Sequence, residues 1–405
     1  MPSRTATSAS SSSRPEKAEK PRCAHFGSCG GCREQERPYE EEFRIKAEKT
    51  ADLLAGAGVP PPSLHPSPKV WHYRNKMEFS FGTWDGSLRL GLKARGRFFE
   101  TLDLTECFLL SPETPRLLES VRAWALRTGL PPYDPRSHKG FLRNLIVREA
   151  RGLKNPSSGP GERMVGIVTA PGEFPSDSFL ECVGRGYPAF SVWRGIHSGV
   201  SDTAASDAIE CLAGPPAITE VLQAAGRRLS FRISPYSFFQ TNSGAAEILY
   251  SLLAAWVRES EVRTALDAFS GAGAIALSLS DALSKVWAIE ASAAAVADAR
   301  ENARLNGIGN VSFYQGPCEI LLGALLDCGP ELAVIDPPRA GLMPRTLKAL
   351  LSAPPRAAIY VSCNPKTLVR DLEALGSRYS CRRAALIDMF PHTEHIEAVV
   401  LLERK

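Results

Sequence analysis

One cysteine near the end of this 405-residue chain occupies a position where a thiol can become a nucleophile. The apolar run 357–361 predicts a buried strand, and the apolar spacing in 367–375 predicts a helix. Between them, Asn364 is a suitable N-cap and Pro365 suits the first helical position. Cys363 would therefore lie at the positive end of a helix dipole, which lowers the pKa of a thiol. The alternative interpretation is a small buried cysteine beside an ordinary helix start.

Three predicted strands upstream end in residues that suit a nucleoside cofactor. A strand over 264–269 leads into a turn with two glycines and then a helix, which allows a ligand to approach the helix N-terminus. The next strand, 285–290, ends in Glu290, whose carboxylate could accept hydrogen bonds from both hydroxyls of a ribose. The strand 331–335 is followed by Asp336, which the two prolines after it hold at the strand end, where open α/β sheets bind ligands. This order of elements predicts an α/β, Rossmann-like doubly wound domain.

The glycine turn alone also fits a different cofactor. Residues 271–276 read Gly-Ala-Gly-Ala-Ile-Ala and satisfy the dinucleotide fingerprint, so an NAD-dependent oxidoreductase is an alternative. Such an enzyme has no obvious use for both an Asp-Pro-Pro turn and a helix-capped cysteine at the ends of later strands. The combination of motifs therefore opposes the oxidoreductase.

Five segments together resemble the RNA uracil-C5 methyltransferases that use S-adenosylmethionine. They are residues 234–242, 267–273, 336–339, 362–365 and 388–397, and the resemblance covers roughly residues 23–405. It implies a class I methyltransferase fold for the catalytic domain. It also disfavours methylation of exocyclic amines, because Arg339 follows Asp-Pro-Pro where those enzymes usually have an aromatic residue.

The resemblance implies a role for each residue that matches the family's motifs. Cys363 would add to C6 of uracil, which makes C5 nucleophilic, and Glu397 would then remove the proton from C5. The residues implied for the S-adenosylmethionine pocket are Gln240, Phe269, Glu290 as the ribose ligand, and Asp336. One position departs from the family: Pro317 replaces a polar residue near the adenine and cannot donate a hydrogen bond, so that contact should come from elsewhere.

Four other cysteines form a second candidate site. Cys23, Cys29 and Cys32 lie close together with intervening glycines, and Cys107 lies farther along the chain. Four thiolates suit either a structural zinc or a [4Fe–4S] cluster, and the ligand type alone does not separate them. The resemblance favours the cluster, because the iron–sulfur members that act on 23S ribosomal RNA share the pattern Cys-x5-Cys-Gly-x-Cys with a distant fourth cysteine.

Composition limits the kinds of binding partner and the cellular compartment that the sequence predicts for this protein. No apolar run approaches the roughly 20 residues of a membrane span. Ten cysteines without a signal peptide predict a reducing cytoplasm. The net charge of +4 is modest, so RNA binding should use local basic patches. The candidates are 71–76, where the resemblance favours Arg74 and Lys76, and 136–143.

The expected organisation has four parts, in a protein that we expect to be monomeric. They are a disordered tail over 1–22, a cluster-binding segment over 23–110 that includes a helix at 38–57, a central α+β RNA-binding domain over 69–230, and a catalytic domain over 231–405. The cluster favours ribosomal RNA as the substrate. The alternatives are a transfer-RNA methyltransferase and an RNA-binding factor that has lost catalysis.

Overall fold

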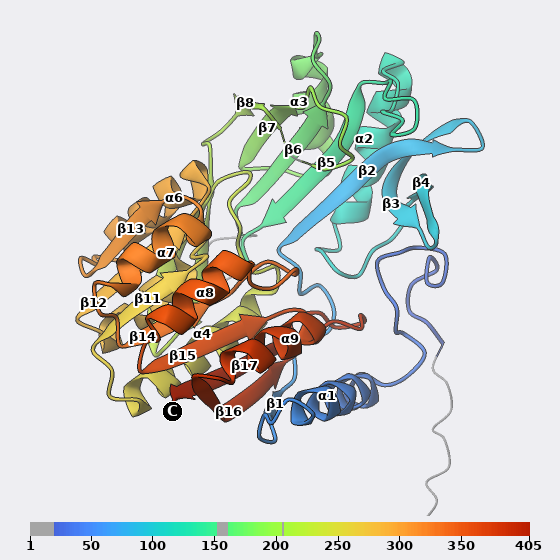
Figure 1. Ribbon diagram of the computed structural model, residues 1–405. Helices are drawn as coiled ribbons and strands as arrows, with labels where there is room; N and C mark the ends of the chain where they lie inside the picture. The colour runs from blue at the N-terminus through green and yellow to red at the C-terminus, as the bar shows by residue number, and fades with distance from the viewer. Residues whose placement is uncertain (1–19, 152–160, 205) are drawn as a thin grey trace, which may run out of the picture.

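The computed structural model describes residues 20–151, 161–204 and 206–405 (Figure 1). Most of the tail predicted over 1–22, and most of a turn-rich loop predicted over 155–161, lie outside the described residues. None of the helices in the described ranges is long and apolar enough to cross a membrane.

An eight-stranded sheet forms the catalytic half of the molecule. Its strands are β1 (Ser63–His65), β11 (Thr264–Ala268), β12 (Lys285–Glu290), β13 (Val311–Gln315), β14 (Leu332–Ile335), β15 (Ala357–Ser362), β16 (Tyr379–Ile387) and β17 (Glu397–Arg404). Their order is β1–β16–β17–β15–β14–β11–β12–β13. Strands β11 to β15 run parallel, whereas β17 lies antiparallel to both β15 and β16. The strands predicted near residues 264, 285, 331 and 357 are therefore confirmed.

Helices cover both faces of this sheet. One face carries α4 (Ser243–Glu259), α5 (Ala274–Leu279), the short 3-10 helix Ser280–Ala282 and α6 (Ala293–Leu305); the other carries α1 (Tyr39–Ala55), α7 (Cys318–Leu326), α8 (Pro344–Ser352) and α9 (Pro365–Leu375). Side chains alternate along each strand, so Leu332 and Val334 of β14 pack into the first core and Ala333 and Ile335 into the second. The doubly wound α/β prediction is confirmed.

Helix α1 packs against a different part of the protein from the one that the sequence analysis assigned. The predicted helix 38–57 was grouped with the cysteine segment, but α1 lies beside α9 on the catalytic sheet (Figure 1). Its apolar stripe of Phe43, Ala47 and Leu54 is buried in the core beneath α7, α8 and α9. A residue pattern shows that a helix has an apolar face, but not which sheet covers that face.

A seven-stranded sheet forms the other half of the molecule. Its strands are β2 (Lys76–Trp84), β3 (Ser87–Ala94), β4 (Arg97–Asp103), β5 (Leu142–Glu149), β6 (Arg163–Thr169), β7 (Ser191–Ile196) and β8 (Ala208–Ala213), in the order β3–β4–β2–β5–β6–β7–β8. Helices α2 (Thr114–Thr128) and α3 (Ser176–Gly186) pack on one face. From the other face, Ile146, Met164 and Trp193 enter the core that contains α4 and the hairpin β9 (Ile218–Ala224)–β10 (Arg227–Ile233). One apolar core therefore joins the two sheets.

Candidate active site and cysteine cavity

Three predicted site residues meet at one edge of the catalytic sheet because of the strand directions. Asp336 and Cys363 directly follow β14 and β15, which are parallel neighbours and end at the same edge. Strand β17 is antiparallel to β15 and begins with Glu397 at that edge. The register pairs Ser362 with Ala398, so Cys363 follows in register opposite Glu397. The helix start after Cys363 is as predicted: Asn364 is the N-cap, its side chain accepts from the backbone N–H of Lys366, and a proline begins α9.

All six predicted catalytic and cofactor residues line one cavity of 690 Å³ at this edge. They are Gln240, Phe269, Glu290, Asp336, Cys363 and Glu397. This size lies within the range of small-molecule sites in proteins. The cavity therefore unites residues from segments more than 150 positions apart in the chain.

The cofactor end of the cavity is preorganised by backbone hydrogen bonds. The two carboxylate oxygens of Glu290 accept from the N–H groups of Gly271 (2.9 Å) and Ser292 (2.7 Å). This carboxylate is thereby fixed at the end of β12, where a ribose could reach it. Phe269, between β11 and the glycine turn, has a φ of 68°, a left-handed conformation that is unusual for a bulky residue and is common at functional sites.

Sequence reasoning missed several residues of this cavity. Phe238, which is 62% exposed, and Phe390 supply aromatic surface, and Glu319 lies two residues after Pro317. Glu319 is a polar side chain that could supply the adenine contact that Pro317 lacks. The aromatic residues belong to motifs that the sequence analysis quoted, but nothing in their spacing indicated that they face the cavity.

Carboxyl groups at the sheet edge are held in an environment that favours their neutral form. Removal from water raises the pKa of Asp336, and burial together with the charge of Asp336 raises the pKa of Glu397 well above its usual value. The side chain of Gln240 donates a long hydrogen bond to Asp336 (3.5 Å). A carboxylate with a raised pKa binds a proton tightly, which is the property that a general base needs.

The pKa of Cys363 corrects one sequence expectation. Burial and the nearby charge of Glu397 raise the pKa of this thiol to about 11, although Arg339 opposes the change. The helix dipole was expected to lower it, but burial and a like charge outweigh the dipole here. The free thiol is therefore protonated at neutral pH.

A buried ion-pair network links α1 to the segment 388–397. The Lys46 ammonium donates to Asp388 (2.7 Å) and Glu42 (3.3 Å) and to two backbone carbonyls of the same segment. Glu42 in turn accepts from the backbone N–H of His392 (2.7 Å), and the Tyr39 hydroxyl donates to Asp388 (2.9 Å). The network fixes the segment that ends in the predicted base, and sequence reasoning did not find it.

The basic and aromatic segment 71–76 is partly buried in the protein. Trp71 stacks on His392 with ring centroids 3.7 Å apart. Tyr73 and Asn75 are buried, and Lys76 forms an ion pair with Glu78 at 2.5 Å. Arg74 and Lys76 are themselves half-buried, so their role in RNA binding stays a prediction. In the other candidate segment, Arg143 is also buried, whereas Arg136 is exposed.

The four predicted cluster cysteines line a separate, small cavity. Cys23, Cys29, Cys32 and Cys107 surround it together with apolar side chains that include Trp71 and Phe108. His25 also lines this cavity, and its Nε2 accepts a hydrogen bond from the backbone N–H of Thr105 (3.0 Å). Across residues 20–151, 161–204 and 206–405, no group of three or more His, Cys, Asp or Glu side chains has an arrangement that would hold a metal ion.

This chain is similar in sequence to proteins that are described as RNA methyltransferases. Residues 212–405 match the family described as tRNA (uracil-5-)-methyltransferase. A protein of Caldanaerobacter subterraneus subsp. tengcongensis, named as an uncharacterized RNA methyltransferase, is 36% identical over 399 residues, which cover 96% of this chain and 86% of the relative. A protein of Clostridium tetani with the same description is 35% identical over 394 residues, covering 95% and 84%.

A solved structure resembles both halves of the molecule. It is the crystal structure of Pyrococcus abyssi tRNA (uracil-54, C5)-methyltransferase in complex with S-adenosyl-L-homocysteine. The TM-score is 0.73 and the sequence identity 26%, and the match covers 93% of this chain and 86% of the other.

Proposed function

The chain belongs to the RNA (uracil-C5)-methyltransferase family, whose members use S-adenosylmethionine, and from this membership we propose that it methylates C5 of a uridine in RNA. We propose 23S ribosomal RNA as the substrate because of the four cysteines that resemble those of the iron–sulfur members. The proposed nucleophile is Cys363 and the proposed base is Glu397. The observation that carries this proposal is the register of β15 and β17, which brings the thiol and the carboxyl group to one cavity with Glu290 and Asp336.

The proposed mechanism assigns a step to each of the two residues. The Cys363 thiol first gives its proton to water, because the free thiol is protonated at neutral pH. The thiolate sulfur then forms a bond to C6 of uracil, the C5–C6 double bond opens, and electron density moves to C5 as an enolate. Bound S-adenosylmethionine supplies the electrophilic methyl group that C5 then takes. Glu397 removes the proton from C5, the double bond forms again, and the thiolate of Cys363 leaves.

The cofactor role of the other cavity residues follows from their positions. We propose that Glu290 accepts hydrogen bonds from the ribose hydroxyls, since two backbone N–H groups already fix its carboxylate. Gln240, Phe269 and Asp336 would line the methionine and adenosine parts of the site. Family membership sets aside the NAD-dependent oxidoreductase. The presence of both Cys363 and Glu397 opposes the factor without catalysis, and a methyl-transfer assay separates the two.

We also propose that Cys23, Cys29, Cys32 and Cys107 hold a [4Fe–4S] cluster. The support is the donor set, four thiols from two distant segments around one cavity with apolar walls, although in the described residues these thiols are not arranged to hold a metal ion. A cluster there would tie the cysteine segment to the loop before α2 and contribute to folding. We propose a cytoplasmic, monomeric protein, in keeping with ten cysteines that are all free.

Replacing Cys107 with Ser should lower the iron content of protein purified without air and destabilise the half that contains the seven-stranded sheet. The reason is that the other three ligands lie in one short loop, so Cys107 provides the link to the sheet. Iron and sulfide analysis with thermal unfolding measures both effects, and Cys211→Ser, at an exposed and isolated cysteine, is the control. A full complement of iron in Cys107→Ser, or zinc in the unaltered protein, would contradict the assignment.

A specific observation favours transfer RNA as the alternative substrate, because the similar solved structure is a tRNA (uracil-54, C5)-methyltransferase. The experiment that separates the two uses transcripts of 23S ribosomal RNA and of transfer RNA with methyl-labelled S-adenosylmethionine. We expect label in the ribosomal transcript. Label in transfer RNA alone would favour the alternative.

A further inference from the structure

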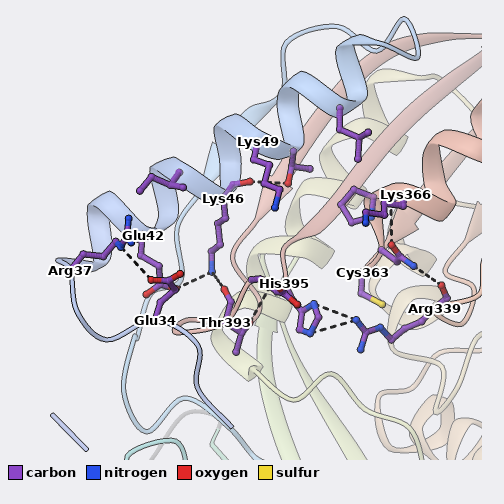
Figure 2. Close-up of a pocket in the computed structure, with 16 residues that line it drawn as sticks. Glu34, Arg37, Glu42, Lys46, Lys49, Arg339, Cys363, Lys366, Thr393 and His395 are labelled. Atoms are coloured by element: carbon purple, nitrogen blue, oxygen red, sulfur yellow. Dashed lines mark hydrogen bonds and ion pairs between the residues drawn. The ribbon is translucent and has the colours of Figure 1, made fainter. Parts of the chain in front are cut away.

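A second cavity, of 440 Å³, lies beside Cys363 on the side of helix α1 (Figure 2). Its walls are α1, the start of α9 and the segment 393–395. Cys363 and Arg339 line both this cavity and the one that holds the proposed cofactor residues. A polynucleotide whose uracil reaches Cys363 can therefore continue into this second space.

Five cations line the cavity, and three of them, from three separate elements, have no carboxylate partner in the described part of the chain. These three are Lys49 of α1, Arg339 after β14, and Lys366 of α9. All three are exposed, and within the described part of the chain no ion pair is found for Lys49 or Lys366, while Arg339 bonds only to the ring of His395 and not to a carboxylate. Figure 2 shows Lys49 extending from α1 on one side, and Cys363 and Lys366 at the start of α9 on the other.

The acidic residues of the cavity are mostly matched by other cations. Glu42 is paired with the buried Lys46, and Glu34 is paired with Arg37 (3.2 Å). Glu394 is the remaining carboxylate of the lining, and it is exposed. Unpaired positive charge therefore exceeds unpaired negative charge, which is the balance that a phosphodiester would neutralise.

Helix α1 presents two distinct faces. Phe43, Ala47 and Leu54 face the core, whereas Ile45, Lys49 and Leu53 are spaced four residues apart and line the cavity. Ile45 is 37% exposed and Leu53 39%, so two apolar side chains stand open on either side of a free ammonium group. In this pattern the ammonium group could contact a phosphate, and the two apolar side chains could contact the sugar and base of the same nucleotide.

We infer that this cavity binds the nucleotide next to the target uridine, with Lys49 and Lys366 contacting its phosphate from opposite walls. The inference rests on the proposed function, because it takes the target base to react at Cys363. The ligand class is one nucleotide of a single-stranded RNA segment. Helix α1, which the sequence analysis grouped with the cysteine segment, thereby becomes part of the RNA-binding surface of the catalytic half.

The test compares Lys49→Ala, Lys366→Ala and the double variant with Arg44→Ala. Arg44 lies on α1, is exposed and paired with Glu48, and does not line the cavity. The Arg44→Ala substitution therefore removes one positive charge from the same helix without changing the cavity. Binding of a fluorescein-labelled oligouridylate RNA is measured over a range of KCl concentrations. For single strands each lost phosphate contact should reduce the salt slope of log K by about 0.7. Each lysine variant should also bind about tenfold more weakly.

The expected result is a reduced slope for the lysine variants, an unchanged slope for Arg44→Ala, and unchanged S-adenosylmethionine affinity in all of them. Wild-type slopes in the lysine variants would overturn the inference, even if the unaltered protein methylates RNA. A failure of the unaltered protein to methylate any RNA would instead count against the proposed function, and the two failures are thus distinguishable.

Discussion

A Glu397→Gln enzyme is expected to stall with RNA covalently bonded to Cys363. Glutamine has nearly the same shape as glutamate, so the buried side chain should be accommodated with little repacking. It cannot accept the proton from C5, and loss of a general base typically slows turnover by about 10²–10⁴-fold. Addition at C6 and methylation at C5 do not need that base, so the reaction should stop before elimination.

The charges at the site also indicate that addition and methylation can proceed without Glu397, whereas elimination cannot. The charge of Glu397 is one cause of the raised pKa of Cys363, so a neutral glutamine should lower the pKa of the thiol and favour the thiolate. Formation of the sulfur–carbon bond should therefore survive the substitution. The measurement is a denaturing gel of the reaction with methyl-labelled S-adenosylmethionine, in which label should migrate with a protein–RNA adduct.

Two variants control this experiment. Cys363→Ala lacks the sulfur and should form no adduct. Glu403→Gln changes an exposed glutamate at the other end of β17, outside both cavities, and it should release methylated RNA without trapping. Release of product by Glu397→Gln at the wild-type rate would rule out Glu397 as the base.

Lys46→Met is expected to lower the free energy of unfolding by about 3–5 kcal/mol, the usual effect of removing one partner of a buried ion pair. The ammonium group is 8% exposed, and its partners Asp388 and Glu42 are 0% and 2% exposed. Without it, two buried carboxylates lose their cation, and Asp388 keeps only the Tyr39 hydroxyl and local backbone bonds. Urea unfolding at neutral pH measures the loss.

The pH dependence of this loss has a defined sign. Burial already raises the pKa of Asp388, and Lys46 opposes that change. Without Lys46 the folded-state pKa should rise further, so the folded protein would bind more protons than the unfolded chain. The difference in the free energy of unfolding between the unaltered protein and Lys46→Met should therefore be small in acid and grow as the pH rises toward neutral.

Lys49→Met is the matched control for stability, because it removes an exposed lysine from the next turn of the same helix. It should change stability by less than about 0.5 kcal/mol. If Lys46→Met were as stable as Lys49→Met, the network between α1 and the segment 388–397 would not have the energetic role that its burial indicates.

Much of the catalytic site could be predicted from the ends of strands. Parallel strands end at one edge of a sheet, and the sequence analysis placed Asp336 and Cys363 each at the end of a predicted strand. The position of Glu397 opposite Cys363 depends on the antiparallel register of β17, which no local pattern encodes. For that residue the family resemblance, rather than the physics of the sequence, provided the assignment.

Other features depend on tertiary packing and were therefore missed. The pKa of Cys363 is set by burial and by a residue 34 positions later in the chain, which outweigh the helix start that sequence reveals. The aromatic and basic residues at 71–76 have the composition of an RNA-binding surface, yet Trp71 and Tyr73 are used in packing between the two halves. Composition alone does not distinguish a buried interface from an exposed one.

The most direct test of the central claim is the identity of the methylated nucleoside. Unaltered protein is incubated with RNA and methyl-labelled S-adenosylmethionine, the RNA is digested to nucleosides, and these are separated and identified by mass spectrometry. The account predicts 5-methyluridine as the labelled product, and none from Cys363→Ala. Label on a ribose hydroxyl or an exocyclic amine, or 5-methyluridine formed equally well by Cys363→Ala, would contradict it.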